Sequence, residues 1–199
     1  MSREMPTQTS DLVMKTTLQQ SSKWADRFIK AAIIQGALAA ALTAYLLYEG
    51  VYGTPAASRI IANLGAAGNA GIWLTVGYLV YIPLGPIAAA VTALFYQHLE
   101  AHMHKPYTGL TNILAWAHII LMNVGVVGAT WLMMNAGYRG GAAALPTSSG
   151  GLGWTTLQIH TNIMEGYPGY IAPFVAIAIV GAVAGGLGYL IAWRRTATA

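Results

Sequence analysis

Four long apolar runs, separated by polar or glycine-rich segments, dominate the pattern of this 199-residue sequence. They cover residues 31–49, 72–97, 110–135 and 170–193. A helix needs about 20 mainly apolar residues to cross the hydrocarbon layer of a membrane, whereas the strands of a membrane barrel would alternate polar and apolar positions over about ten residues. Because the runs are long and continuous, we predict an all-α integral membrane four-helix bundle with short interfacial helices.

The first thirty residues are polar and differ from the rest of the chain. They lack the apolar core of a cleavable signal peptide, so we expect residues 1–30 to form a cytoplasmic N-terminal segment. Residues 15–30 could form an amphipathic helix at the inner membrane surface, because Trp24 and Phe28 are four residues apart and share one side of a helix. Residues 31–199 are then expected to form the four-span transmembrane domain.

Charged residues make up only 8% of the chain, compared with about 25% in soluble domains. Among the basic residues, Arg59 and Arg139 lie in the segments after the first and third spans. The others precede the first span, separate the second from the third, or follow the fourth: Arg3, Lys15, Lys23, Arg27, Lys30, Lys105, Arg194 and Arg195. The positive-inside rule therefore predicts that both termini are cytoplasmic and that the chain lies in the plasma membrane. We attribute the net charge of +4 to contact with anionic lipid and expect no nucleic-acid partner, because these residues form no binding motif.

The chain contains no cysteine. This excludes disulfides, iron–sulfur clusters, thiolate zinc sites and covalently attached c-type haem. Any bound metal must be held by histidine, carboxylate or methionine side chains, or by a ligand from another molecule.

His118 is the histidine predicted to lie deepest in the membrane. It follows Thr108 by ten residues, which places it about 15 Å from the inner end of the third span at a rise of 1.5 Å per residue. An ionisable residue at this depth is a candidate functional residue, and axial ligation of a haem is the leading hypothesis. The alternative is a neutral imidazole that forms a hydrogen bond with a neighbouring helix through Asn123 or Asn112.

Three of the five histidines lie close together near the end of the second span, in the stretch FYQHLEAHMHK at residues 95–105. His98 and His102 are four residues apart and share a helix face, so they could bind a metal if another helix or chain supplied a further ligand. The glutamate between them does not match the HExxH motif of zinc proteases. His98 is also a second candidate haem ligand, although its expected depth differs from that of His118 by about 6 Å. The alternative is that these histidines end a helix at the inner surface and face water.

Residues 137–169 are predicted to form a long outer loop. It contains a glycine- and serine-rich run, RGGAAALPTSSGGLG, followed by residues 154–165, which we expect to form a short interfacial helix anchored by Trp154. A long loop in a small protein is often functional. We therefore predict that Trp154, His160 and Glu165 contact a partner subunit.

Small residues in the third and fourth spans predict close helix packing. Lipid is as apolar as the helices, so association in a membrane depends on close contacts between small residues and on interhelical hydrogen bonds. We identify Gly125, Gly128, Gly181 and Gly185 as packing positions, the last two forming a GxxxG pair. The two prolines in PLGP, at residues 83–86, are expected to bend the second span.

The third span carries a resemblance to a known group of proteins. The stretch AWAHIILMNVGVVGATWLMMNAGY, together with the preceding HLEAHMHKPYTG, resembles the small integral-membrane subunits that accompany haem–copper terminal oxidases or related membrane cytochromes. The resemblance implies a respiratory-chain subunit near a b- or a-type haem. The chain departs from the catalytic subunit of such oxidases, because it has four predicted spans and no adjacent histidine pair for a binuclear copper centre.

From these observations we predict an accessory or haem-binding subunit of a multisubunit respiratory oxidoreductase, with no catalytic residues of its own. Its expected partners are other integral membrane subunits and lipid, with a quinone or an outer-side electron donor as further partners. Two alternatives are a purely structural membrane subunit without a cofactor, and a small channel or carrier. A subunit of a copper-dependent membrane monooxygenase is a fourth reading, in which His98 and His102 would bind the metal with a carboxylate.

Overall fold

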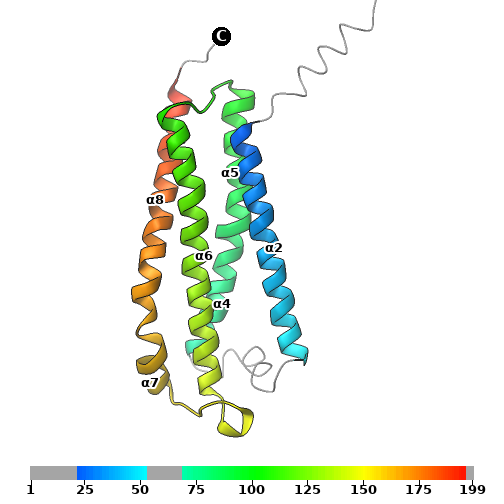
Figure 1. Ribbon diagram of the computed structural model, residues 1–199, viewed down its shortest axis with the longest axis vertical. Coiled ribbons are helices and arrows are strands. Elements are labelled where there is room, and N and C mark those ends of the chain that lie inside the picture. Colours follow the sequence, from blue (N-terminus) through cyan, green and yellow to red (C-terminus); the bar gives the residue numbers. More distant parts are fainter. Residues whose placement is uncertain (1–21, 53–68, 196–199) are drawn as a thin grey trace, which may run out of the picture.

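The computed structural model describes residues 22–52 and 69–195 of the chain (Figure 1). All four predicted spans are confirmed as helices that are long and apolar enough to cross a membrane. They are α2 (Lys23–Tyr52), a composite second helix, α6 (Leu110–Ala144) and α8 (Tyr167–Arg194). The composite helix consists of α4 (Asn69–Ile82), a π-helical turn (Pro83–Ile87), α5 (Ala88–Gln97) and a second π-helical turn (His98–His102).

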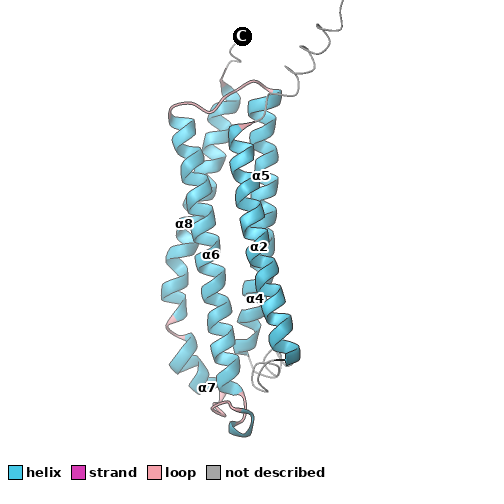
Figure 2. Cartoon of the chain, turned by 45° about the vertical axis from the view of Figure 1, so that its right-hand side comes forward, coloured by secondary structure: helices cyan, strands magenta, loops and turns pink. Residues whose placement is uncertain are grey.

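The four helices lie side by side, with α8 and α6 on one side and α2 on the other side of the composite helix (Figures 1 and 2). The first residues of α2 and the last residues of α8 lie at the same end, which we call the inner end (Figure 1). The short helix α7 (Thr156–Ile159) lies at the opposite, outer end and is followed by a π-helical turn, His160–Met164.

The helix boundaries that differ most from the apolar runs are the start of α2 and the end of α6. Helix α2 begins at Lys23, so residues 23–30 continue directly into the first span. Trp24 and Phe28 are buried in a core cluster with Tyr96 and Leu99, which explains why this turn joins the bundle. Residues 1–21, which include the start of the predicted interfacial helix, lie outside the described residues.

The predicted outer loop, residues 137–169, is partly helical. Helix α6 continues to Ala144, because Gly137 and Gly140 let it pack closely against α4 and the outer turn. A Cβ atom on Gly140 would lie 2.6 Å from the Cβ of Ala70. The expected short helix over 154–165 corresponds to α7 and the π-helical turn that follows it.

The four glycines predicted as packing positions all lie where α6 meets α8. A Cβ atom on Gly125 would lie 2.5 Å from the backbone nitrogen of Ala178, and one on Gly181 would lie 2.8 Å from that of Met122. Gly128 faces the ring of Phe174, and Gly185 faces the ring of His118. The absence of side chains at these positions therefore allows the two backbones to approach closely, as membrane helix packing requires.

The two prolines of the second span coincide with a π-helical turn at Pro83–Ile87. Pro86 has no backbone N–H to donate, so the regular hydrogen-bond ladder is interrupted there. Gly85 faces α2, and a Cβ atom on it would lie 3.1 Å from Oε1 of Gln35. The turn thus brings the backbone of the second span close to a polar side chain of the first.

Candidate functional site

His118 lies where four helices meet. Its ring is half-buried and packs against Phe28 of α2, with ring centroids 5.0 Å apart. The hydroxyl of Tyr96 on α5 lies 3.3 Å from Nδ1 of His118. On the α8 side the ring meets Gly185. The hydrogen bond expected with a neighbouring helix is therefore made with Tyr96, whereas Asn123 and Asn112 were the expected partners.

A second polar cluster joins α2, α4 and α6 just outward of His118. The side-chain amide of Gln35 donates to Oδ1 of Asn123 at 2.8 Å, and the hydroxyl of Tyr81 donates to Oε1 of Gln35 at 2.5 Å. Asn123 donates in turn to the backbone oxygen of Ile119 at 2.6 Å. Gln35 and Tyr81 are buried, and these bonds satisfy polar groups that apolar surroundings would otherwise penalise.

The space beside His118 is small. A cavity of about 20 Å³ is lined by His118, Gln35, Asn123 and Thr92, among others. A cavity needs about 10 to 15 Å³ to hold one water molecule. The cavity could therefore hold about one water, and this packing does not fit a haem macrocycle beside His118. Haem ligation by this residue would require α8 or α2 to move away from the ring.

His98 and His102 lie at the inner end and are exposed, with ring centroids 5.9 Å apart. His118 meets this helix through Tyr96, and two residues along a helix correspond to about 200° of rotation, so His98 faces another direction. The fold thus does not bring His98 and His118 together. Within the described residues, no group of three or more His, Cys, Asp or Glu side chains could hold a metal ion.

Glu100 holds the inner end of the bundle together. Its carboxylate accepts hydrogen bonds from the hydroxyl of Ser22, from the backbone N–H of Trp24 at 3.1 Å and from that of Tyr107 at 3.5 Å. A carboxylate at the first turn of α2 also interacts favourably with the helix dipole. In the sequence Glu100 stood out only as the glutamate between His98 and His102, because partners 76 and 78 residues away leave no local pattern.

Tyr107, in the segment between the π-helical turn His98–His102 and α6, is buried against Tyr96 with ring centroids 4.8 Å apart. Burial raises the pKa of its phenol, and the neighbouring Tyr96 and Glu100 add to the effect. Within the described part of the chain its hydroxyl has no hydrogen-bond partner. A buried hydroxyl of this kind lowers stability, because it has lost water without gaining a partner.

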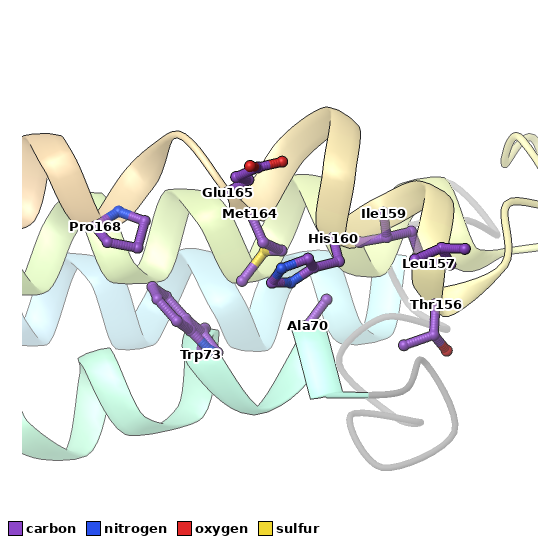
Figure 3. A pocket seen from close by; sticks show the side chains of 9 residues that line it. All are labelled: Ala70, Trp73, Thr156, Leu157, Ile159, His160, Met164, Glu165 and Pro168. Atoms are coloured by element: carbon purple, nitrogen blue, oxygen red, sulfur yellow. The ribbon is translucent and has the colours of Figure 1, made fainter.

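The outer end contains a cavity of about 840 Å³ (Figure 3). It is bounded by the start of α4, by α7 with its following turn, and by the start of α8. His160 and Glu165 line it, as does Trp73 of α4. Trp154, the third predicted contact residue, does not line the cavity and packs half-buried against a core cluster that includes Ala70, Ile159 and Met164.

Local sequence features fix the walls of this outer cavity. Helix α7 begins with a capping box, in which the backbone N–H of Thr155 donates to Oε1 of Gln158 at 2.9 Å. His160 and Met164 are four residues apart in the turn that follows. Pro168 stands in the first turn of α8, where a proline costs no hydrogen bond. Trp73 and Met164 were not singled out in the sequence, because an apolar residue in a span carries no distinguishing signal.

Comparison with known proteins gives no relative for this arrangement. No protein-family model, no curated protein and no solved structure matches the chain.

Proposed function

We propose that this chain is an accessory integral-membrane subunit of a multisubunit respiratory oxidoreductase, resembling the small subunits of terminal oxidases. The resemblance lies in residues 98–138, which supply the inner histidine segment and most of α6. The contacts of α6 with α8, α4 and α2 make it the central helix of the bundle. In this accessory role the chain supports its partner subunits, and the partner subunits carry out the redox chemistry.

The observation that carries this proposal is that polar side chains inside the spans pair with one another across neighbouring helices. His118 pairs with Tyr96, Gln35 pairs with Asn123, and the hydroxyls of Thr43 and Tyr78 lie 2.6 Å apart. Each pair joins two different helices. Interhelical hydrogen bonds stabilise bundles in lipid, so this interior is suited to a scaffold that holds its shape within a larger complex.

The distribution of charge supports a cytoplasmic inner end and a location in the plasma membrane. Six described basic residues belong to the inner end, namely Lys23, Arg27, Lys30, Lys105, Arg194 and Arg195, whereas Arg139 belongs to the outer half of α6. Contacts with other side chains also hold two of the six, Arg27 and Arg195, in place. Arg27 lies between Trp24 and Trp116, at 4.3 and 4.6 Å from the ring centroids, and Arg195 donates to the hydroxyl of Thr108 at 3.0 Å.

Haem binding by this chain remains a separate prediction. Because His118 packs tightly against Gly185, we favour an accessory subunit that binds no haem itself. A pyridine haemochrome spectrum of the isolated chain tests the point, and we expect no haem absorption. A stoichiometric b- or a-type spectrum that His118→Ala abolishes would show instead that the bundle opens around this residue.

Co-purification tests the accessory role itself. The chain, tagged at one terminus and expressed in its native host, would be extracted in a mild detergent and its partners identified by mass spectrometry. We expect stoichiometric subunits of a haem-containing oxidoreductase and an absorption spectrum in the purified complex. Recovery of the chain alone, or with partners that carry no redox cofactor, would contradict the proposal and favour a purely structural subunit or a carrier.

A further inference from the structure

The outer cavity continues into a groove along α8. An open apolar groove of about 500 Å³ is lined by residues of α4, α6 and α8, and it shares Trp73 and Pro168 with the outer cavity. On α8 it extends from Pro168 to Ile179. Eleven residues of helix cover about 16 Å, so the groove runs from the outer end toward the middle of the span. Cavity and groove together form one elongated site with a wide outer end.

The outer cavity, which forms the wide end of this site, combines an apolar wall with the imidazole ring of His160. Ala70, Ile159 and Met164 are buried and form its apolar wall. The indole of Trp73 and the ring of His160 point into the same space, with the sulfur of Met164 between them (Figure 3). The backbone oxygen of His160 accepts from Glu165, but within the described residues the ring of His160 makes no hydrogen bond, so a ring N–H is free to donate to a ligand.

The charge of the site selects against a phospholipid head group. Among the described residues that line the cavity and the groove there is no lysine or arginine, and the ionisable residue besides His160 is Glu165. Among these described residues a phosphate would meet the carboxylate of Glu165 and no lysine or arginine, which is unfavourable near low-dielectric surroundings. The Glu165 carboxylate lies on the far side of Met164 from Trp73 (Figure 3), so Met164 separates this charge from the indole. An uncharged, planar head with a hydrogen-bond acceptor fits this arrangement.

We propose that the outer cavity and the groove bind a membrane quinone, with its ring against Trp73 and His160 and its isoprenoid tail along α8. The aromatic ring of Trp73 stacks on the quinone ring, and an imidazole N–H of His160 donates to a quinone carbonyl. The volume of about 840 Å³ lies within the range of about 300 to 1,000 Å³ found for small-molecule sites. The choice of a quinone among neutral amphiphiles rests on the proposed respiratory role.

Photolabelling of the full-length chain in phosphatidylcholine nanodiscs tests this binding. An azido-quinone with an alkyl tail would be cross-linked, and the labelled peptides identified by mass spectrometry. We expect saturable labelling in peptides that contain Trp73 or residues 156–168, and displacement by unlabelled decyl-quinone. Because the isolated chain is used, the result does not depend on whether the chain co-purifies with an oxidoreductase.

Matched variants distinguish binding of the quinone at a specific site from its simple dissolution in the lipid. His160→Leu removes the donor and is expected to weaken labelling about three- to tenfold, the effect of one hydrogen bond. Its control is Thr161→Leu, an exposed neighbour that does not line the cavity. Ala172→Trp fills the groove and is expected to abolish labelling, whereas Ala182→Trp places the same bulk on an exposed part of α8 outside the groove.

Two results would overturn the proposal. One is labelling that does not saturate, or that both tryptophan variants leave unchanged, because the quinone would then be dissolved in lipid. The other is equal displacement by phosphatidylglycerol or by a tail without a ring, because the site would then accept any apolar chain. Loss of labelling in all four variants would point to a general unfolding, which their circular dichroism spectra would reveal and which would likewise remove the support for a local site.

Discussion

Gly185 of α8 lies directly against the imidazole of His118 on α6, and a Cβ atom at position 185 would overlap Nδ1, Cε1 and Cγ of that ring. The ring of His118 thus occupies the space that a side chain at position 185 would need. The same ring meets Phe28 and Tyr96 on its other sides. Gly185 therefore serves two purposes, because it lets α8 approach α6 and it leaves room for the imidazole of His118.

Gly185→Leu should destabilise the bundle, because the new side chain cannot enter the space that His118 occupies. Overpacking a tight interior typically costs about 1 to 3 kcal/mol, and we expect a loss at the upper end of this range. Thermal unfolding in detergent micelles would measure it. Gly186→Leu is a matched control, since a Cβ atom at Gly186 meets nothing within 4 Å.

The pairing of the two residues can be tested with a double variant. If the clash with the imidazole is the cause, His118→Ala should restore part of the stability that Gly185→Leu removes, giving a non-additive cycle. Additive losses would show that Gly185→Leu acts through the α8 backbone and not through His118.

Tyr107→Phe should stabilise the protein. The Tyr107 hydroxyl is buried without a partner in the described structure, and leaving such a group unsatisfied costs about 1 to 3 kcal/mol. Tyr96→Phe removes a similar hydroxyl that faces His118 at 3.3 Å, and it should instead lower stability by about 0.5 to 1.5 kcal/mol. Opposite shifts in melting temperature are expected, and a loss in both variants would mean that Tyr107 does bind a partner such as an ordered water.

The sequence allowed the number of spans and their type to be predicted, because each apolar run has about the length that a helix needs to cross the hydrocarbon layer. The packing glycines were also recognisable from their spacing, and all four lie between α6 and α8. The partners of His118 were not recognisable. Tyr96 and Gly185 are 22 and 67 residues away from it, and only the way in which the helices cross decides which side chains meet.

The same limit explains the outer cavity. His160 and Glu165 stood out because polar residues are rare in this chain, whereas Trp73 resembles every other aromatic residue in a span. The long loop was predicted too long for a physical reason. Glycines are normally a sign of loops, but Gly137 and Gly140 are needed inside α6, where Leu74 and Ala70 of α4 leave no room for a Cβ atom.

Gln35→Leu should loosen the contact between the first span and the rest of the bundle. It leaves the Tyr81 hydroxyl and the Asn123 carbonyl without their bonds to Gln35. Interhelical hydrogen bonds in membranes contribute about 0.6 to 2 kcal/mol each, so we expect a loss of about 1 to 3 kcal/mol in detergent unfolding. Asn112→Leu is the control, because Asn112 makes no side-chain hydrogen bond within the described residues, and it should change stability much less.

Glu100→Ala should detach the start of α2 from the inner end of the bundle. The substitution leaves the Ser22 hydroxyl and the Trp24 N–H without their acceptor, and Ser22 caps α2 through a 2.9 Å bond from the N–H of Ala25. Each unsatisfied group costs about 1 kcal/mol or more when it is shielded from water, so we expect a loss of about 2 to 3 kcal/mol and faster hydrogen exchange at residues 23–28.

Asp26→Ala provides the comparison for Glu100→Ala, because Asp26 is also an acidic residue of the inner end. Its partner is Lys30, at 2.7 Å in an exposed pair four residues along the same helix. Such surface pairs contribute about 0 to 1 kcal/mol, so Asp26→Ala should leave exchange at the start of α2 almost unchanged. Similar effects of the two variants would mean that charge at the helix start matters more than the bonds that Glu100 makes across the bundle.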